Sequence, residues 1–185
     1  MDSRPGNSLS EKELAKLAGN GDYRGQQELY LRYAGVMTAV ASRYLSDSDM
    51  VKDVLQDAFI RIYERIGSYR YRGEGSLRAW MCKIVANGAL QALRKQGRLL
   101  PVSEIPDVLP DEDPDVENVP LDVLQEMIRK LPDGYRTVFN LFVFGQLKHK
   151  EIAALLGIKE NSSASQYLRA KALLAKEIKE YRKNG

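Results

Sequence analysis

A strip rich in proline and acidic residues, 101–120, limits what this chain can fold into more than any other feature. It holds five of the seven prolines, seven acidic residues, no basic residue and no aromatic one. Proline breaks helices, and an acidic segment without large apolar side chains cannot bury a core. We therefore expect an extended linker here, which divides the chain into two folded parts.

The two parts on either side of this linker are basic. The whole chain of 185 residues has a formal net charge of only +3, but the linker alone holds seven of its 25 acidic residues. The linker thus masks a larger positive charge on the flanking parts. Clustered positive charge favours a polyanionic partner.

The composition is that of a globular protein and argues against a membrane protein. Hydrophobic residues make up 44% of the chain and charged residues 29%. No run approaches the about 18 apolar residues of a membrane span, and the N-terminal residues lack the apolar core of a signal peptide. We expect a cytoplasmic protein.

Residues that carry metal or redox chemistry are sparse. The single cysteine, Cys82, excludes an internal disulfide, and the single histidine, His149, leaves no cluster for zinc. The sequence has neither a phosphate-binding loop nor a convincing pair of nucleophile and base. We therefore expect no metal, no cofactor and no enzymatic activity.

Periodic apolar residues predict three helices in the first 66 residues. Ser10 and Glu13 form a capping-box pattern, which predicts a short helix over 11–18. Amphipathic helices follow over 25–45 and 50–66. The outer face of the second of these carries Asp53, Gln56, Asp57, Arg61 and Glu64. Taken alone, such a face is more often merely solvated than functional.

The next helix, predicted over 76–98 with Ser76 as N-cap, contains five basic residues and no acidic one. Helical spacing places one polar stripe on its outer face. This stripe consists of Trp80, Lys83, Asn87, Gln91, Arg94 and Arg98. It suits single-stranded nucleic acid, because cations follow the phosphates, an aromatic ring stacks on a base and an amide reads a base edge. The alternative is an amphipathic helix with a solvated basic face.

The part after the linker predicts four helices. The pattern breaks at Leu131-Pro132-Asp133 and at Gly145, and a short apolar helix, a turn at Gly157 and a longer basic helix from about Ser162 follow. This order is typical of a helix-turn-helix, although an ordinary pair of packed helices is the alternative. The outer face of the last helix carries Asn161, Ser162, Ser165, Leu168, Arg169, Ala172 and Lys176.

Four segments in this order resemble bacterial sigma factors of the sigma-70 family, and the short two-domain form resembles their extracytoplasmic-function (ECF) group. The segments are DMVKDVLQDAFIRIYERI, GSLRAWMCKIVANGAL, LPDGYRTVFNLFVFGQLKHKEIAALLGI and SASQYLRAK. The resemblance spans about residues 22–182. It implies an all-α fold, with a region 2-like bundle over 22–98 and a region 4-like helix-turn-helix domain over 121–182. A segment with a short helix, 1–21, precedes them, and the acidic linker, 99–120, joins them.

The resemblance also implies partners and roles for single residues. The expected partners are core RNA polymerase, promoter DNA and an anti-sigma factor. Core polymerase would be bound by Asp53, Gln56 and Asp57. The unpaired minus-10 strand would be read by Trp80, Lys83, Asn87, Arg94 and Arg98, and the minus-35 duplex by Ser162, Ser165, Gln166, Arg169 and Lys171.

Three positions depart from the family pattern, and two alternative functions stay open. Ala164 and Gln166 stand where the family usually has basic residues, which leaves fewer phosphate contacts at the start of the reading helix. His149 replaces a usual tyrosine, which we interpret as a packing variant. The alternative is a helix-turn-helix regulator that binds DNA without joining the polymerase. A helical adaptor that binds only proteins is a weaker one.

Overall fold

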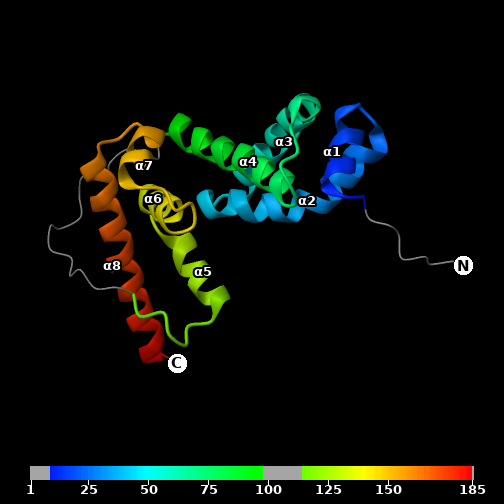
Figure 1. The fold of residues 1–185 in the computed structure, drawn as a ribbon. Coiled ribbons are helices and arrows are strands. Elements are labelled where there is room, and N and C mark those ends of the chain that lie inside the picture. Colours follow the sequence, from blue (N-terminus) through cyan, green and yellow to red (C-terminus); the bar gives the residue numbers. More distant parts are fainter. Residues whose placement is uncertain (1–8, 98–113, 185) are drawn as a thin grey trace, which may run out of the picture. The chain divides into compact units, whose positions relative to one another are not determined.

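The computed structural model describes residues 9–97 and 114–184. Within these ranges every regular element is a helix, which confirms the expected all-α fold (Figure 1). The chain divides into two compact units, one made of residues 1–41 and 49–89, the other of 42–48 and 90–185. Most of the predicted linker lies outside the described residues.

The first unit contains the helices predicted before the linker. Its elements are α1 (Glu11–Gly19), α2 (Tyr23–Tyr44), α3 (Ser48–Arg65), the 3-10 turn η1 (Ile66–Ser68) and α4 (Ser76–Lys95), and the last residues of α2 and α4 belong to the second unit. The capping box at the start of α1 is present, because Ser10 Oγ accepts from Glu13 N and the Glu13 carboxylate accepts from Ser10 N. The apolar faces of the helices are buried, and their fully buried side chains include Leu14, Leu29, Met37, Ile62, Leu77, Met81 and Val85.

Glycines let the helices of the first unit approach one another closely. A methyl group on Gly25 of α2 would lie 2.7 Å from Leu17 Cβ and 2.8 Å from Ala18 N. At the end of α1, a Cβ on Gly19 would lie 3.1 Å from Gly67 Cα. These contacts fix α1 against α2 and against the turn that follows α3.

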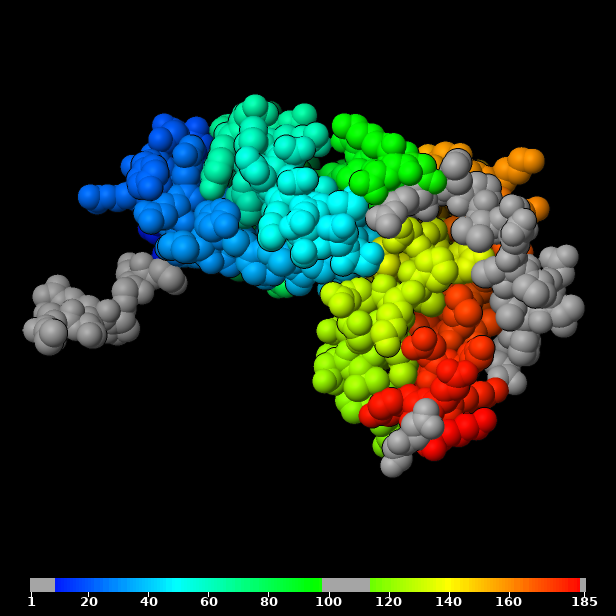
Figure 2. Space-filling model, turned by 180° about the vertical axis from the view of Figure 1, so that it is seen from behind, coloured from blue at the N-terminus to red at the C-terminus, as the bar shows by residue number. Residues whose placement is uncertain are grey.

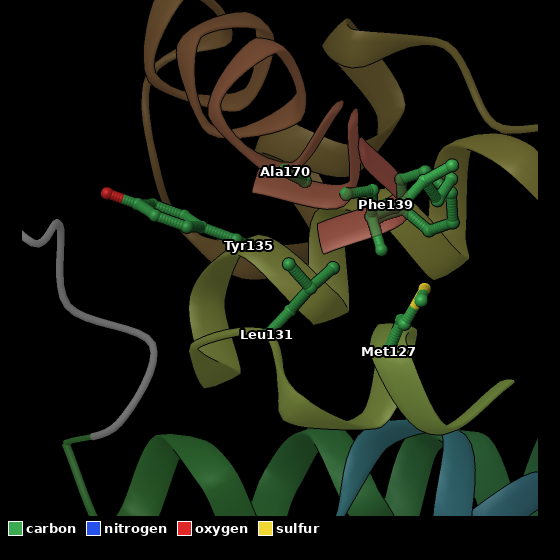
Figure 3. Close-up of a cluster of buried hydrophobic side chains, with 7 residues drawn as sticks. Met127, Leu131, Tyr135, Phe139 and Ala170 are labelled. Atoms are coloured by element: carbon green, nitrogen blue, oxygen red, sulfur yellow. The ribbon is translucent and has the colours of Figure 1, made fainter. Parts of the chain in front are cut away.

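The second unit contains α5 (Leu121–Lys130), α6 (Asp133–Val143), α7 (His149–Leu156) and α8 (Glu160–Asn184). In the space-filling view of Figure 2, α5 and the end of α8 lie against each other. One apolar cluster joins α5, α6 and α8, and the close-up in Figure 3 shows Met127, Leu131 and Phe139 near one another, with the Tyr135 ring extending to the side. Its buried members are Met127, Leu131, Tyr135, Phe139, Ala170, Leu174 and Ile178.

A buried arginine fixes the turn between α5 and α6. Arg136 is only 2% exposed, and its Nη1 donates to the carbonyl oxygens of Arg129 and Leu131 at 2.7 and 3.1 Å. Its Nη2 forms an ion pair with Asp133. The positive charge thus satisfies carbonyl groups at the end of α5 that no further helical turn could pair.

A second arginine ties the segment before α5 to the end of α8. Arg182 Nη1 lies 2.6 Å from Asp115 Oδ2, and Nη2 donates to the carbonyl of Glu117 at 2.7 Å. The hydrogen bond from Arg182 lowers the pKa of Asp115. Both side chains are exposed, so this contact is open to screening by salt.

The contact between α1 and α2 gives the first test. We predict that Gly25→Ala lowers the free energy of unfolding by about 1–3 kcal/mol, because the new methyl group would overlap α1. The matched control is Gly35→Ala on the same helix, where a Cβ meets nothing within 4 Å. The free energy of unfolding of this control should rise by about 0.5–1 kcal/mol, because alanine has a higher helix propensity than glycine. Urea denaturation, followed by the fluorescence of the only tryptophan, Trp80, measures both. Equal effects of the two variants would contradict the described packing.

Candidate nucleic-acid interface

The outer stripe of α4 lies on the exposed side of the helix, as its spacing predicts. Lys83 and Asn87 are exposed and Trp80 is half-buried, whereas the opposite face is buried in the core. Gln91 and Arg94, further along α4, are exposed as well, and Arg98 lies outside the described residues. The inner face packs closely on α3, since a Cβ on Gly88 would lie 3.3 Å from Val54 Cγ1.

An aromatic pair forms at the start of this stripe. The rings of Tyr69 and Trp80 are 5.1 Å apart between centroids and inclined by 41°. Tyr69 belongs to the loop before α4, and sequence reasoning assigned it no contact of its own. The pair presents a partly exposed ring surface beside the cations of α4, an arrangement that suits a stacked base.

Ser76, which was expected to be the N-cap of α4, instead holds the loop before this helix. Ser76 was expected to cap α4, but it is the first residue of the helix. Its Oγ lies 2.6 Å from Tyr69 Oη and donates to the carbonyl of Gly73, and Arg72 N donates to it at 3.2 Å. Ser76 therefore fixes the loop and the Tyr69 ring, and the expectation that it caps α4 is wrong.

The first amide groups of α4 are instead capped by a carboxylate from α1. Glu11 accepts from Leu77 N at 3.1 Å and from Arg78 N at 3.4 Å. Its Oε1 also accepts from Tyr33 Oη at 2.9 Å, and the carboxylate is only 5% exposed. Burial and the bond to Glu11 raise the pKa of Tyr33 to about 12, so the hydroxyl keeps its proton at neutral pH.

The outer face of α3 presents the residues expected to bind polymerase. Asp53, Gln56 and Asp57 are all exposed, at spacings that keep them on one side of the helix. Ile60 continues this face and is 50% exposed, an apolar side chain that the sequence analysis did not single out. The face therefore combines carboxylates, an amide and one apolar group.

The second unit contains the expected helix-turn-helix. Gly157 ends α7 in the left-handed region at φ 70°, a conformation that favours glycine, and α8 begins at Glu160. His149 stacks on Phe142 at 4.7 Å, and its Nδ1 lies 3.0 Å from the Oγ of buried Ser163. Phe142 also contacts Tyr167 at 4.4 Å. His149 thus packs between helices, which confirms its interpretation as a packing variant.

The residues that were expected to read duplex DNA differ in their exposure to solvent. Ser165 is exposed, and Ser162 and Arg169 are half-buried. Lys171 is half-buried beside Tyr167, with its Nζ 5.9 Å from the ring centroid.

Gln166 does not lie on the outer face. It is only 4% exposed, and its Oε1 would lie 3.1 Å from a Cβ on Gly134 of α6. Because glycine leaves space at this point of α6, the long amide of α8 fills it. This burial argues against a contact between Gln166 and DNA.

Two properties of the described residues limit the chemistry. No group of three or more His, Cys, Asp or Glu side chains among them could hold a metal ion. Likewise, none of the helices in the described ranges is both long and apolar enough to cross a membrane.

Comparison with known proteins gives matches over both units. Residues 29–99 match the family model described as sigma-70 region 2, and residues 121–174 match that described as sigma-70, region 4. The ECF RNA polymerase sigma-E factor of Escherichia coli (strain K12) is 27% identical over 184 residues, which cover 92% of this chain and 95% of that protein. The RNA polymerase sigma-H factor of Pseudomonas aeruginosa is 24% identical, with coverage of 91% and 93%. A solved sigma factor, RpoE in complex with the anti-sigma factor NepR from Bartonella quintana, shares 20% identity at a TM-score of 0.48. That match covers 83% of this chain and 96% of RpoE.

The burial of Gln166 gives the second test. We predict that Gln166→Ala lowers the free energy of unfolding by about 1–3 kcal/mol, because it leaves a cavity against Gly134. The control Ser165→Ala, at an exposed position of the same helix, should stay within about 0.5 kcal/mol of the parent. Urea denaturation followed by circular dichroism measures both. A Gln166 variant that keeps full stability but loses affinity for DNA would contradict the buried position.

Proposed function

Since the chain belongs to the sigma-70 family, as an extracytoplasmic-function (ECF) RNA polymerase sigma factor, we propose that its two units divide the reading of a promoter. The first unit reads an unpaired minus-10 strand and the second reads the minus-35 duplex. The observation that carries this division is the Tyr69–Trp80 pair, which lies at the head of the exposed stripe of α4. Stacking on an aromatic ring requires an unpaired base, so the Tyr69–Trp80 pair on the same stripe as the exposed amide of Asn87 favours single-stranded DNA over duplex.

Each residue of the first surface has a proposed role that fits its exposure. The half-buried ring of Trp80, supported by Tyr69, stacks on a base. The exposed amide of Asn87 reads a base edge, and Lys83 lies between them to contact the phosphate backbone. Arg94 extends the same line of cations along α4, and Arg98, which lies outside the described residues, is proposed for the same role.

The second surface is the N-terminal half of α8, which we propose enters the major groove. A helix that follows such a turn reads base edges with its first exposed residues. The side chains that we propose for reading base edges are Ser162, Ser165 and Arg169. Lys171 would contact the phosphate backbone. Since Ala164 carries no charge and Gln166 is buried, Arg169 supplies most of the direct readout.

The proposed binding surface for core polymerase is the outer face of α3. Its exposed carboxylates, Asp53 and Asp57, favour a basic partner, and Gln56 and Ile60 add a hydrogen-bonding and an apolar contact. We also propose an anti-sigma factor as a regulating partner, as is common in the ECF group. A chain that works in this way acts in the cytoplasm with RNA polymerase and catalyses no reaction itself.

The surface on α3 gives the third test. We predict that the double variant Gln56→Ala/Asp57→Ala keeps its helical content but binds core polymerase about tenfold more weakly, because both side chains lie on an exposed face. The control is Gln27→Ala at an exposed position of α2. Affinity is measured by titration of labelled chain with core polymerase, and run-off transcription with and without the chain gives the functional readout. Unchanged affinity of the double variant would exclude this face. Full promoter binding without polymerase would favour the alternative of a simple regulator.

The division of reading gives the fourth test. Two probes are selected from random pools by the parent holoenzyme, a 12-nucleotide single strand and a 20-base-pair duplex. We predict that Asn87→Ala weakens binding of the single strand by about 1–3 kcal/mol, roughly 10- to 100-fold, and leaves binding of the duplex unchanged. Arg169→Ala should do the reverse, so each variant serves as the control for the other. Equal losses on both probes would show that the two units do not divide the reading.

A further inference from the structure

The N-terminal helix α1 lies before the stretch that matches sigma-70 region 2, which begins at residue 29. Nothing in the proposed function uses it, yet it contains a buried acidic side chain, Glu11. A carboxylate removed from water needs partners that offset its lost hydration. Within the described part of the chain, Glu11 accepts hydrogen bonds from other helices, namely from Tyr33 on α2 and from Leu77 and Arg78 on α4.

The partners on α4 are the groups that a helix cannot satisfy by itself. Leu77 and Arg78 lie in its first turn, where backbone N–H groups have no carbonyl one turn earlier to bind. This end of a helix also carries partial positive charge, which a carboxylate stabilises. The first turn of α4 contains no acidic residue of its own. Glu11 therefore supplies from 66 residues away the charge that this turn lacks.

Both ends of α1 contact the segment that leads into the reading surface. Glu11 at its start binds the first turn of α4, and Gly19 at its end approaches Gly67 to within backbone contact. The loop between Gly67 and α4 contains Tyr69, which is tied to Ser76 and contacts the Trp80 ring. Helix α1 thus holds the loop and the first turn of α4 from both sides.

We propose that Glu11 is a positioning residue for the reading of unpaired DNA. It holds the first turn of α4, and with it the Tyr69–Trp80 pair, in the binding geometry before the strand arrives. This inference rests on the proposed function of the first unit. A surface that is already ordered loses less conformational entropy when a ligand binds, so its affinity is higher than that of the same residues on a loose turn.

The experiment compares substitutions at two carboxylates of α1. Glu11→Ala removes the cap, and Glu11→Gln removes its charge but keeps an acceptor oxygen. Glu13→Gln is the matched control, because the exposed Glu13 binds Ser10 and no other residue of the described ranges, in a capping-box position where glutamine also serves. Each full-length variant is assembled with core polymerase, and its affinity is measured for the 12-nucleotide single strand, for the 20-base-pair duplex and for core polymerase.

We expect Glu11→Ala to bind the single strand about tenfold more weakly, with unchanged affinity for the duplex and for core polymerase. Glu11→Gln should lie between Glu11→Ala and the parent, and Glu13→Gln should match the parent. Hydrogen exchange of the amides of Leu77 and Arg78 should become faster in the Glu11 variants only. The fluorescence of Trp80 should change in the same order, because its environment includes the Tyr69 ring.

Three results would overturn the inference. The first is strand affinity equal to that of the parent in both Glu11 variants, even if their amides exchange faster. The second is an equal loss on strand, duplex and polymerase, which would indicate general destabilisation. If Glu11→Ala does not fold, the same two criteria apply to Glu11→Gln. The third is a parent holoenzyme that binds no single strand, which overturns the proposed function of the first unit as well. If the parent binds the strand and the Glu11 variants bind it equally well, only the inference about Glu11 fails.

Discussion

Each of the two units contains a buried charge that pairs the free backbone groups at the end of a helix. A helix leaves its first N–H groups and its last carbonyl groups unpaired, and its dipole makes these ends positive and negative. Glu11 brings a carboxylate to the positive end of α4, and Arg136 brings a guanidinium to the carbonyl groups at the end of α5. Because both groups are buried, removal of either charge would leave polar partners away from water, the condition under which a lost bond is most costly.

Most helices of the described chain could be predicted from the sequence, because helical periodicity and local capping are properties of neighbouring residues. The capping box at Ser10, the inner and outer faces of α3 and the stripe of α4 all follow from steps of three and four residues. The turn at Gly157 also follows from local chemistry. Local patterns predict which side of a helix is buried and roughly where the helix ends. They do not predict which other helix it packs against.

The parts that sequence reasoning missed depend on contacts between distant residues. Ser76 was expected to cap α4, but the carboxylate of Glu11, which lies 66 residues before Leu77, has that role. Gln166 lies at the edge of the inner face of α8, and only the missing side chain of Gly134 on α6 decides that it is buried. The sequence places Tyr69 in the loop before α4, but it does not show that its ring packs against Trp80. No local pattern contains these pairings.

The ion pair between Arg182 and Asp115 binds the residues before α5 to α8, the helix that is proposed to read duplex DNA. Because residues 115–117 are bound to α8, they belong with helices α5–α8 and do not count as chain that joins the two DNA-reading surfaces. For two binding sites on one chain, the length of the joining segment sets the effective concentration of the second site once the first is occupied. Salt weakens this exposed contact, and its loss would release residues 115–117 from α8. Ionic strength would therefore act on the cooperation between the two DNA-reading units, in addition to its direct effect on each phosphate contact.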